Sequence, residues 1–314
     1  GFDSNTLVWV PAITFVSTAN AARFCGSKVE FIDVDPSTSN ICCASLEDQL
    51  ISAEASGRLP DYLFIVHMAG TPCDLDRIFQ LCLRYSIKII EDASHALGAR
   101  YFERPIGSFA QTEATIFSFH PVKMITTGEG GAVVSHRSGL INQIRKLSSH
   151  GIKRSGQRYS WEYDQTELGF NYRLPELNCA LGLSQLEKLS RFIKTRNALA
   201  SLYDQLFDDD KILGQRVENN TVSSRHLYII RSPLIKTLDQ KETLVNILAS
   251  VGIRTQVHYI PLYRHSYYQA ARQHEYAGAE EYYKSCLTLP LHVNLTEEQI
   301  HFIAGQVKKA AERL

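Results

Sequence analysis

The chain has 314 residues, of which 44% are hydrophobic and 21% charged, and its 33 basic side chains balance its 33 acidic ones. This length suits one large domain with a smaller one, and the zero net charge argues against binding to nucleic acid or an acidic membrane. No apolar run approaches the roughly 20 residues of a membrane span, and no charged-then-apolar leader opens the sequence. The seven cysteines lack CxxC or metal-ligand spacing, so we expect free thiols, a reducing cytoplasm and no metal site.

Apolar runs alternate with helical patterns in the first half of the chain. Ser45, with Asp48 three residues later, approaches a capping box at the start of the first predicted helix. Strands separated by helix-length connections predict a mostly parallel sheet in an α/β fold. The predicted strands are 5–15, 29–35, 62–70, 87–92, 114–119 and 131–136, and the predicted helices are 45–55 and 74–85.

The second half has a different texture. A helical pattern spans 174–207 and leads into a smaller α+β lobe, while the polar stretch 151–167 is predicted to be a loop. We therefore predict a major domain at 1–194 and a C-terminal small domain at 195–314. Within the smaller lobe, strands are predicted at 226–231 and 255–260, and helices at 238–251, 278–287 and 297–313.

Chemically useful side chains follow two of the predicted strands. The run 87–92 ends at Asp92 with His95 three residues later, and the run 114–119 contains Ser118 and leads to Lys123 before a Gly-rich turn. Ligands collect at the carboxyl ends of such strands. Pyridoxal 5′-phosphate (PLP) needs this pair, because its aldehyde forms a Schiff base with a lysine and its pyridine nitrogen needs a carboxylate to stay protonated. Ser118 is a candidate to donate a hydrogen bond from its hydroxyl to the cofactor phosphate. His95 is a candidate to lie over the pyridine ring or to reach its 3′-oxygen.

Each of these residues also has a simpler interpretation. A lysine in a turn is commonly solvated, and an aspartate at a strand end commonly caps the next helix. The combination of Asp92, Ser118 and Lys123 at two strand ends before Gly-Glu-Gly-Gly favours a site over a surface.

Three longer motifs carry a family resemblance. The segments 91–99, 106–134 and 168–186 resemble motifs of the DegT/DnrJ/EryC1/StrS nucleotide-sugar aminotransferases, a PLP-dependent group of fold type I. The resemblance implies that Lys123 is the Schiff-base lysine and proton shuttle, and that Asp92 faces the pyridine nitrogen. A few members of the family have histidine at the lysine position and catalyse dehydration, so Lys123 favours transamination. His95 stands where many members have glutamine.

The same resemblance implies a homodimer with shared active sites, because Asn171 matches a residue that reaches the phosphate of the neighbouring subunit's cofactor. His258 and Tyr259 are candidates to line the sugar pocket, the alternative being the two faces of a strand. Arginines are expected to bind the uridine diphosphate and the glutamate carboxylate. The candidates, among which the sequence does not choose, are Arg154, Arg158 and Arg173.

The resemblance further implies the reaction. The expected substrates are L-glutamate and a UDP-linked 4-keto-6-deoxy-N-acetyl-hexose of the kind used in pseudaminic acid synthesis. The alternatives are another nucleotide-linked keto-sugar or a truncated, non-catalytic remnant. Members of the family begin several dozen residues earlier, with a Gly-Thr/Ser loop and a helix N-terminus that bind phosphate, so we expect this sequence to be a fragment or the product of a truncated gene.

Overall fold

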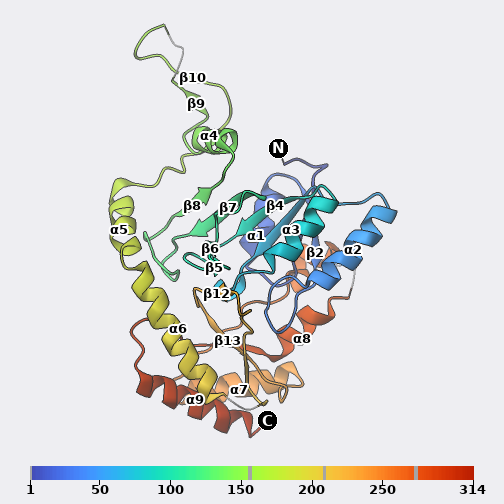
Figure 1. Cartoon of the computed structure of the whole chain (residues 1–314), viewed down its shortest axis with the longest axis vertical. Coiled ribbons are helices and arrows are strands. Elements are labelled where there is room, and N and C mark those ends of the chain that lie inside the picture. The colour runs from blue at the N-terminus through green and yellow to red at the C-terminus, as the bar shows by residue number, and fades with distance from the viewer. Residues whose placement is uncertain (1, 155–157, 208–209, 272–274) are drawn as a thin grey trace.

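The computed structural model describes residues 2–154, 158–207, 210–271 and 275–314. Its largest sheet contains β1 Leu7–Pro11, β2 Lys28–Ile32, β3 Tyr62–Val66, β4 Lys88–Asp92, β7 Thr112–Ser118 and β8 Gly131–Val134. These strands lie in the order β2-β1-β3-β4-β7-β8 (Figure 1). All neighbouring pairs are parallel except β7 and β8, which confirms the predicted mostly parallel α/β sheet.

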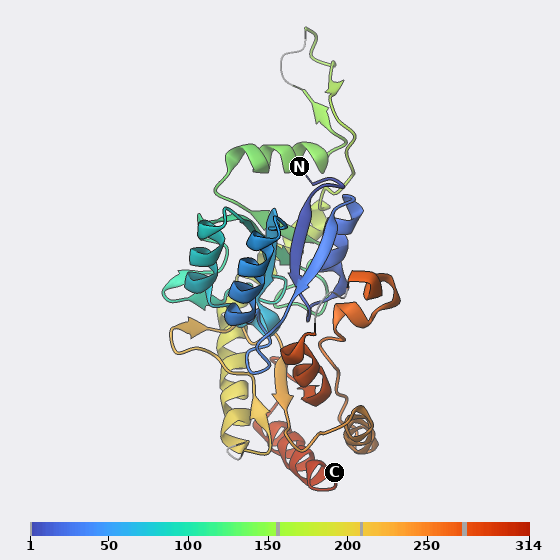
Figure 2. The same ribbon diagram turned by 90° about the vertical axis from the view of Figure 1, so that its right-hand side faces the viewer.

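Helices cover both faces of this sheet. Figure 2 shows α2 (Cys43–Ala55) and α3 (Leu75–Arg84) on one side and α1 (Val16–Phe24) on the other. Successive side chains of β1 point to opposite faces, so Trp9 packs in the core under α2 and α3 while Val10 packs in the core under α1. The strands are therefore buried on both faces, which explains their continuous apolar runs.

The N-termini of α2 and α3 are capped differently. The capping box predicted at Ser45 is wrong, because α2 already begins at Cys43 and its N-cap residue, Cys42, makes no side-chain capping bond. In contrast, the helix predicted at 74–85 is α3, and Asp74 caps it by accepting a 3.2 Å hydrogen bond from the backbone N–H of Arg77.

The helical pattern predicted over 174–207 forms two helices rather than one. These are α5 (Glu176–Leu186) and α6 (Leu189–Leu206), with a break at Glu187 and Lys188. The domain boundary predicted between residues 194 and 195 falls inside α6, and the division into domains stays a prediction.

A separate core lies in the C-terminal part of the chain. Helices α6, α7 (Leu238–Ser250) and α9 (Glu297–Ala311) pack against a sheet of β11 (Leu213–Gly214), β13 (Tyr228–Arg231) and β14 (Cys286–Leu289). The strand predicted at 255–260 is wrong, since only Gln256 makes an isolated bridge, to Thr288. The helix predicted at 278–287 is α8 (Ala277–Ser285), after which the chain turns into β14.

Short elements complete the fold. The 62–70 run is β3 followed by the 3₁₀ turn η1 (Met68–Gly70), because Ala69 and Gly70 adopt positive φ angles. The remaining elements are β5 (Arg100–Tyr101), β6 (Arg104–Pro105), α4 (Ser138–Leu147), β9 (Ile152–Lys153), β10 (Asp164–Gln165), β12 (Thr221–Val222), η2 (Leu262–Arg264) and η3 (Ser266–Ala271).

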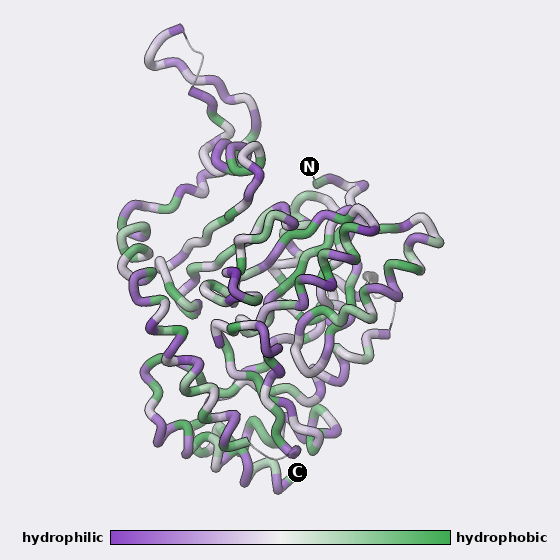
Figure 3. Tube along the Cα trace, viewed as in Figure 1, coloured by the Kyte–Doolittle hydropathy of each residue, from purple (hydrophilic) through white to green (hydrophobic). Residues whose placement is uncertain are grey.

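The β9–β10 segment extends away from the rest of the molecule in both views (Figure 1, Figure 2). It belongs to the stretch 151–167 predicted to be a loop, of which residues 155–157 lie outside the described residues. Figure 3 shows that this projection is largely hydrophilic or neutral, whereas green, hydrophobic segments gather in the sheet. Across the described residues, no helix combines the length and the apolar character needed to cross a membrane.

Candidate functional site

Asp92 is the last residue of β4, and its carboxylate is held by two donors. The hydroxyl of Thr18 donates to Oδ2 at 2.6 Å, and the backbone N–H of Ser94 donates to Oδ1 at 3.0 Å. Thr18 lies on α1, and its hydroxyl also contacts that of Thr14 at 2.9 Å. The carboxylate thus has a fixed orientation at the carboxyl end of the central sheet.

Lys123 follows β7 through a turn in which its backbone N–H donates to the carbonyl of His120 at 2.9 Å. Burial lowers the pKa of the Lys123 amine, and the negative charge of Asp92 partly opposes this by raising it. The amine and the carboxylate therefore act on each other within one site. A lowered pKa increases the fraction of unprotonated amine, which is the form that attacks a carbonyl carbon.

A cavity of about 930 Å³ opens beside Lys123. Its size is in the range of small-molecule sites. The predicted sugar-pocket residues His258 and Tyr259 lie on its wall together with Lys123, and Thr288 fixes the His258 ring through a 2.9 Å contact to Nδ1. Burial, followed by the charge of Lys123, lowers the pKa of His258 to about 4.

His95 is buried beside this cavity with both ring nitrogens in contact. The backbone N–H of Ala69 donates to Nδ1 at 3.3 Å, and the Tyr259 hydroxyl lies 3.3 Å from Nε2. Burial, with smaller contributions from His226 and Lys123, holds the pKa of His95 well below its usual value. The imidazole is therefore neutral at physiological pH.

The backbone that carries His95 is tightly packed. The hydroxyl of Ser224 donates to the His95 carbonyl oxygen at 2.6 Å. Gly70 passes so close, with φ at +90°, that a Cβ there would collide with the Ser224 Oγ and approach the same carbonyl oxygen. A glycine is needed at this position for both reasons.

Two residues that contact the predicted ones are not indicated by the sequence, His226 beside His95 and Thr18 beside Asp92. His226 lies on the cavity wall with its ring centre 4.5 Å from that of His95, and its buried Nδ1 has no hydrogen-bond partner among the described residues. Its position at the start of the strand predicted at 226–231 gives no sign of a role in the site. No local pattern singles out Thr18, because the carboxylate that it holds lies 74 residues away along the chain.

The remaining predicted residues do not line the cavity within the described chain. Ser118 is half-buried at the end of β7, where its Oγ accepts a long 3.4 Å bond from the His120 N–H. Asn171 is exposed and bridges to Ser149. The three predicted arginines also point elsewhere: Arg154 and Arg158 lie over tyrosine rings, and Arg173 donates to the Ser149 hydroxyl.

Two arginines outside the predicted set line the cavity, Arg196, which is buried, and Arg254, which is exposed to solvent. Arg254 is therefore placed to meet an anionic group at the cavity mouth.

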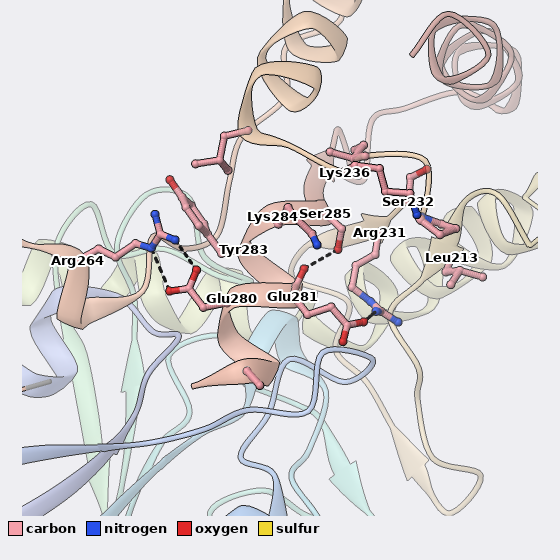
Figure 4. A pocket seen from close by; sticks show the side chains of 14 residues that line it. Leu213, Arg231, Ser232, Lys236, Arg264, Glu280, Glu281, Tyr283, Lys284 and Ser285 are labelled. Carbon is pink, nitrogen blue, oxygen red and sulfur yellow. Dashed lines mark hydrogen bonds and ion pairs between the residues drawn. The ribbon is translucent and has the colours of Figure 1, made fainter. Parts of the chain in front are cut away.

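A second cavity, of about 650 Å³, lies between α8 and the chain that follows β13 (Figure 4). Its arginines are paired with its carboxylates, Arg264 with Glu280 and, at 3.6 Å, Arg231 with Glu281. Lys123, which lines the first cavity, is not among the lining residues of this one. The charges of this cavity mainly hold α8 in place, so we locate the site at the first cavity.

Comparison with known proteins identifies the family of this chain. The DegT/DnrJ/EryC1/StrS aminotransferase family matches residues 1–308. A UDP-4-amino-4,6-dideoxy-N-acetyl-beta-L-altrosamine transaminase of Campylobacter jejuni is 39% identical over 312 residues, which cover 98% of this chain and 80% of the relative. The structure of Helicobacter pylori PseC, an aminotransferase of pseudaminic acid biosynthesis, superposes with a TM-score of 0.90 at 32% identity, covering 100% of this chain and 81% of PseC.

A further neighbour shows the cofactor. A sugar aminotransferase, Spr1654 of Streptococcus pneumoniae, is 27% identical and superposes with TM-scores of 0.90 in its pyridoxamine-phosphate (PMP) form and 0.89 in its PLP form. The residues of this chain fit the same cofactor, because the amine of Lys123 lines the cavity and interacts with the oriented carboxylate of Asp92, and the neutral imidazole of His95 contacts Tyr259 on the cavity wall. The chain therefore belongs to the DegT/DnrJ/EryC1/StrS aminotransferase family, as a PLP-dependent sugar aminotransferase.

Proposed function

We propose that this aminotransferase moves the amino group of L-glutamate to C4 of a UDP-linked 4-keto-6-deoxy-N-acetyl-hexose. The observation that carries the proposal is the shared site of Asp92 and Lys123 beside a cavity large enough for a sugar. The choice of sugar is supported by the Campylobacter and Helicobacter relatives, at 39% and 34% identity, which are both named as transaminases of this UDP-amino-sugar.

The residues of the site divide the work. PLP, when bound, withdraws electrons from the carbon that loses or gains a proton. Lys123 would bind the cofactor covalently and, once its amine is released, carry that proton. Asp92, oriented by Thr18, would hold the proton on the pyridine nitrogen, and His95 would lie beside the ring. The hydroxyl of Ser118 is proposed to donate a hydrogen bond to the phosphate of the cofactor.

A second copy of the chain is proposed to complete the site. Apolar side chains around Asn171 face solvent, and a hydrophobic patch of this kind marks an interface. Leu168 is 90% exposed and Leu177 is 85% exposed. Asn171 lies among them, away from the cavity of its own chain, and would reach the cofactor phosphate of the partner. The other exposed apolar residues of this patch, which we call the α5 patch, are Phe170, Tyr172, Leu181, Leu183 and Leu186.

The dimer is testable with a pair of charge substitutions. Leu177→Glu in the α5 patch should convert a dimer into a monomer in analytical ultracentrifugation. Leu83→Glu is the matched control, because Leu83 is 82% exposed on α3, outside the patch. A chain that is monomeric before any substitution would contradict the shared site.

The substrate assignment is tested by amination assays. Purified protein with PLP is given L-glutamate and the UDP-linked 4-keto-sugar, and the amino-sugar is detected by mass spectrometry, with 2-oxoglutarate as the co-product. L-alanine, L-aspartate and L-glutamine serve as competing donors. Preference for another donor would contradict the glutamate assignment and leave the sugar assignment standing.

One alternative substrate class has specific support. A GDP-perosamine synthase of Caulobacter vibrioides is 32% identical over 305 residues. GDP- and dTDP-linked 4-keto-sugars therefore belong in the substrate panel, and turnover confined to one of them would replace the UDP-sugar proposal. The seven cysteines are unpaired, which supports the proposal that the enzyme works in a reducing compartment such as the cytoplasm.

A further inference from the structure

The contact between Tyr259 and His95 determines where each hydrogen atom lies. A backbone N–H can only donate, so the Nδ1 atom of His95, which receives the N–H of Ala69 at 3.3 Å, has no hydrogen of its own. A neutral imidazole with an unprotonated Nδ1 carries its hydrogen on Nε2. Burial and the nearby groups of His226, Lys123 and His258 keep the pKa of His95 low, so this neutral form persists.

Among the described residues, the Nε2 hydrogen then has one acceptor, the Tyr259 oxygen at 3.3 Å. Because His95 donates in this contact, the hydroxyl hydrogen of Tyr259 is directed elsewhere. Within the described chain, His95 is the hydrogen-bond partner found for this hydroxyl, and Tyr259 lines the same cavity as Lys123. The hydroxyl hydrogen is thus available to a ligand in that cavity.

The ring of Tyr259 is held in this position. Its centre lies 5.7 Å from that of Phe15 and 6.2 Å from that of His95. Burial, with the charge of Asp92, raises the pKa of the Tyr259 hydroxyl, so it keeps its hydrogen throughout the physiological range. A neutral, oriented donor beside an amine is what a carbonyl group needs as the amine adds to it, because charge gathers on the oxygen.

We propose that Tyr259 is a catalytic residue that donates a hydrogen bond to the oxygen on the reacting carbon of the keto substrate, and that His95 is the positioning residue that directs this hydrogen into the cavity. The inference rests on the proposed function, since it requires a ketone at the site. No proton is transferred, because the hydroxyl stabilises the negative charge on the oxygen while keeping its hydrogen.

The hydrogen positions can be tested without turnover. ¹⁵N-histidine NMR on the full chain, with and without PLP, should show a pyridine-type Nδ1 and a pyrrole-type Nε2 for His95, assigned by loss of the signals in His95→Gln. These signals should not titrate between pH 5.5 and 8. A pyrrole-type Nδ1 would overturn the inference whether or not the protein aminates a sugar.

Kinetics test the catalytic half of the inference. Tyr259→Phe keeps the ring and removes the hydroxyl, so kcat for amination should fall about 100-fold while KM and PLP affinity stay unchanged. Tyr268→Phe is the matched control. That residue lies in the same stretch of chain, but its hydroxyl donates to Asn20 Oδ1 at 2.6 Å, and it lines a different cavity from Lys123. Wild-type kcat in Tyr259→Phe would overturn the proposal.

Substitutions of His95 separate positioning from packing. In His95→Gln the side-chain amide offers an acceptor for the Ala69 N–H and a donor for the Tyr259 oxygen, so most of kcat should remain. His95→Leu offers neither and should match Tyr259→Phe. The His95→Leu/Tyr259→Phe double variant should be no slower than either single variant, and fully additive losses would show that the two residues act independently.

Discussion

Three imidazoles at the cavity, of buried His95 and His226 and of half-buried His258, make stability depend on pH, and His258 gives the dependence a magnitude. Its pKa is lowered to about 4 in the folded chain, from an ordinary value of 6.5. The unfolded chain therefore binds a proton on this side chain at a higher pH than the folded chain does. The free energy of unfolding should fall as the pH drops from about 6.5 towards about 4, and should not respond to His258 above about 7.

The size of the effect follows from the shift. Each unit of pKa difference corresponds to about 1.4 kcal/mol, so the ionisation of His258 should remove about 3 kcal/mol of stability across this range. His95 and His226, whose pKa values are also lowered by burial, should act in the same direction. The cavity side of the molecule is therefore expected to be its acid-sensitive part.

Urea unfolding of the cofactor-free protein, repeated from pH 4.5 to 7.5, measures this dependence. His258→Gln should lose part of the slope of unfolding free energy against pH, whatever its stability at pH 7.5. His301→Gln is the matched control, because His301 is exposed on α9 and should leave the slope unchanged. An unaltered slope in His258→Gln would refute the assignment of a half-buried, neutral imidazole.

Three other substitutions have defined outcomes. Thr18→Val removes the 2.6 Å donor to Asp92, so the Kd for PLP, read from the absorbance of bound cofactor, should rise about tenfold or more; an unchanged Kd would contradict this role. Glu91→Leu removes the carboxylate that contacts the buried imidazole of His67 and the buried hydroxyl of Thr115, so the free energy of unfolding in urea should fall by about 3–5 kcal/mol. A fall below about 1 kcal/mol would show that these contacts are dispensable. Gly70→Ala should destabilise the chain much more than Gly57→Ala, because both sites have positive φ but only Gly70 is crowded; equal losses would contradict the crowding argument.

The strands of the large sheet could be predicted from the sequence. Strands that are buried on both faces appear as continuous apolar runs, whatever their order in the sheet. Asp92, Ser118 and Lys123 could be singled out for the same reason, since each follows or ends such a run. The predicted strand at 255–260 failed although its residues alternate, because only Gln256 pairs with a neighbour while His258 and Tyr259 turn towards the cavity.

Other features depended on long-range contacts that no local pattern encodes. The single helix predicted over 174–207 is broken at Glu187 and Lys188, although neither residue is a glycine or proline. Thr18 lies 74 residues from the carboxylate that it holds, and Tyr259 lies 164 residues from His95. Only the fold brings these partners together.

The central claim is that Lys123 and Asp92 hold one PLP ring. Its most direct test is borohydride reduction of the PLP-loaded protein, followed by peptide mapping, in the wild type and in Asp92→Asn. We predict that the PLP-loaded protein is yellow before reduction and that the reduced cofactor is attached to Lys123. Cofactor binding should be much weaker in Asp92→Asn. A protein that stays colourless with added PLP, or a cofactor attached to a different lysine, would contradict the account.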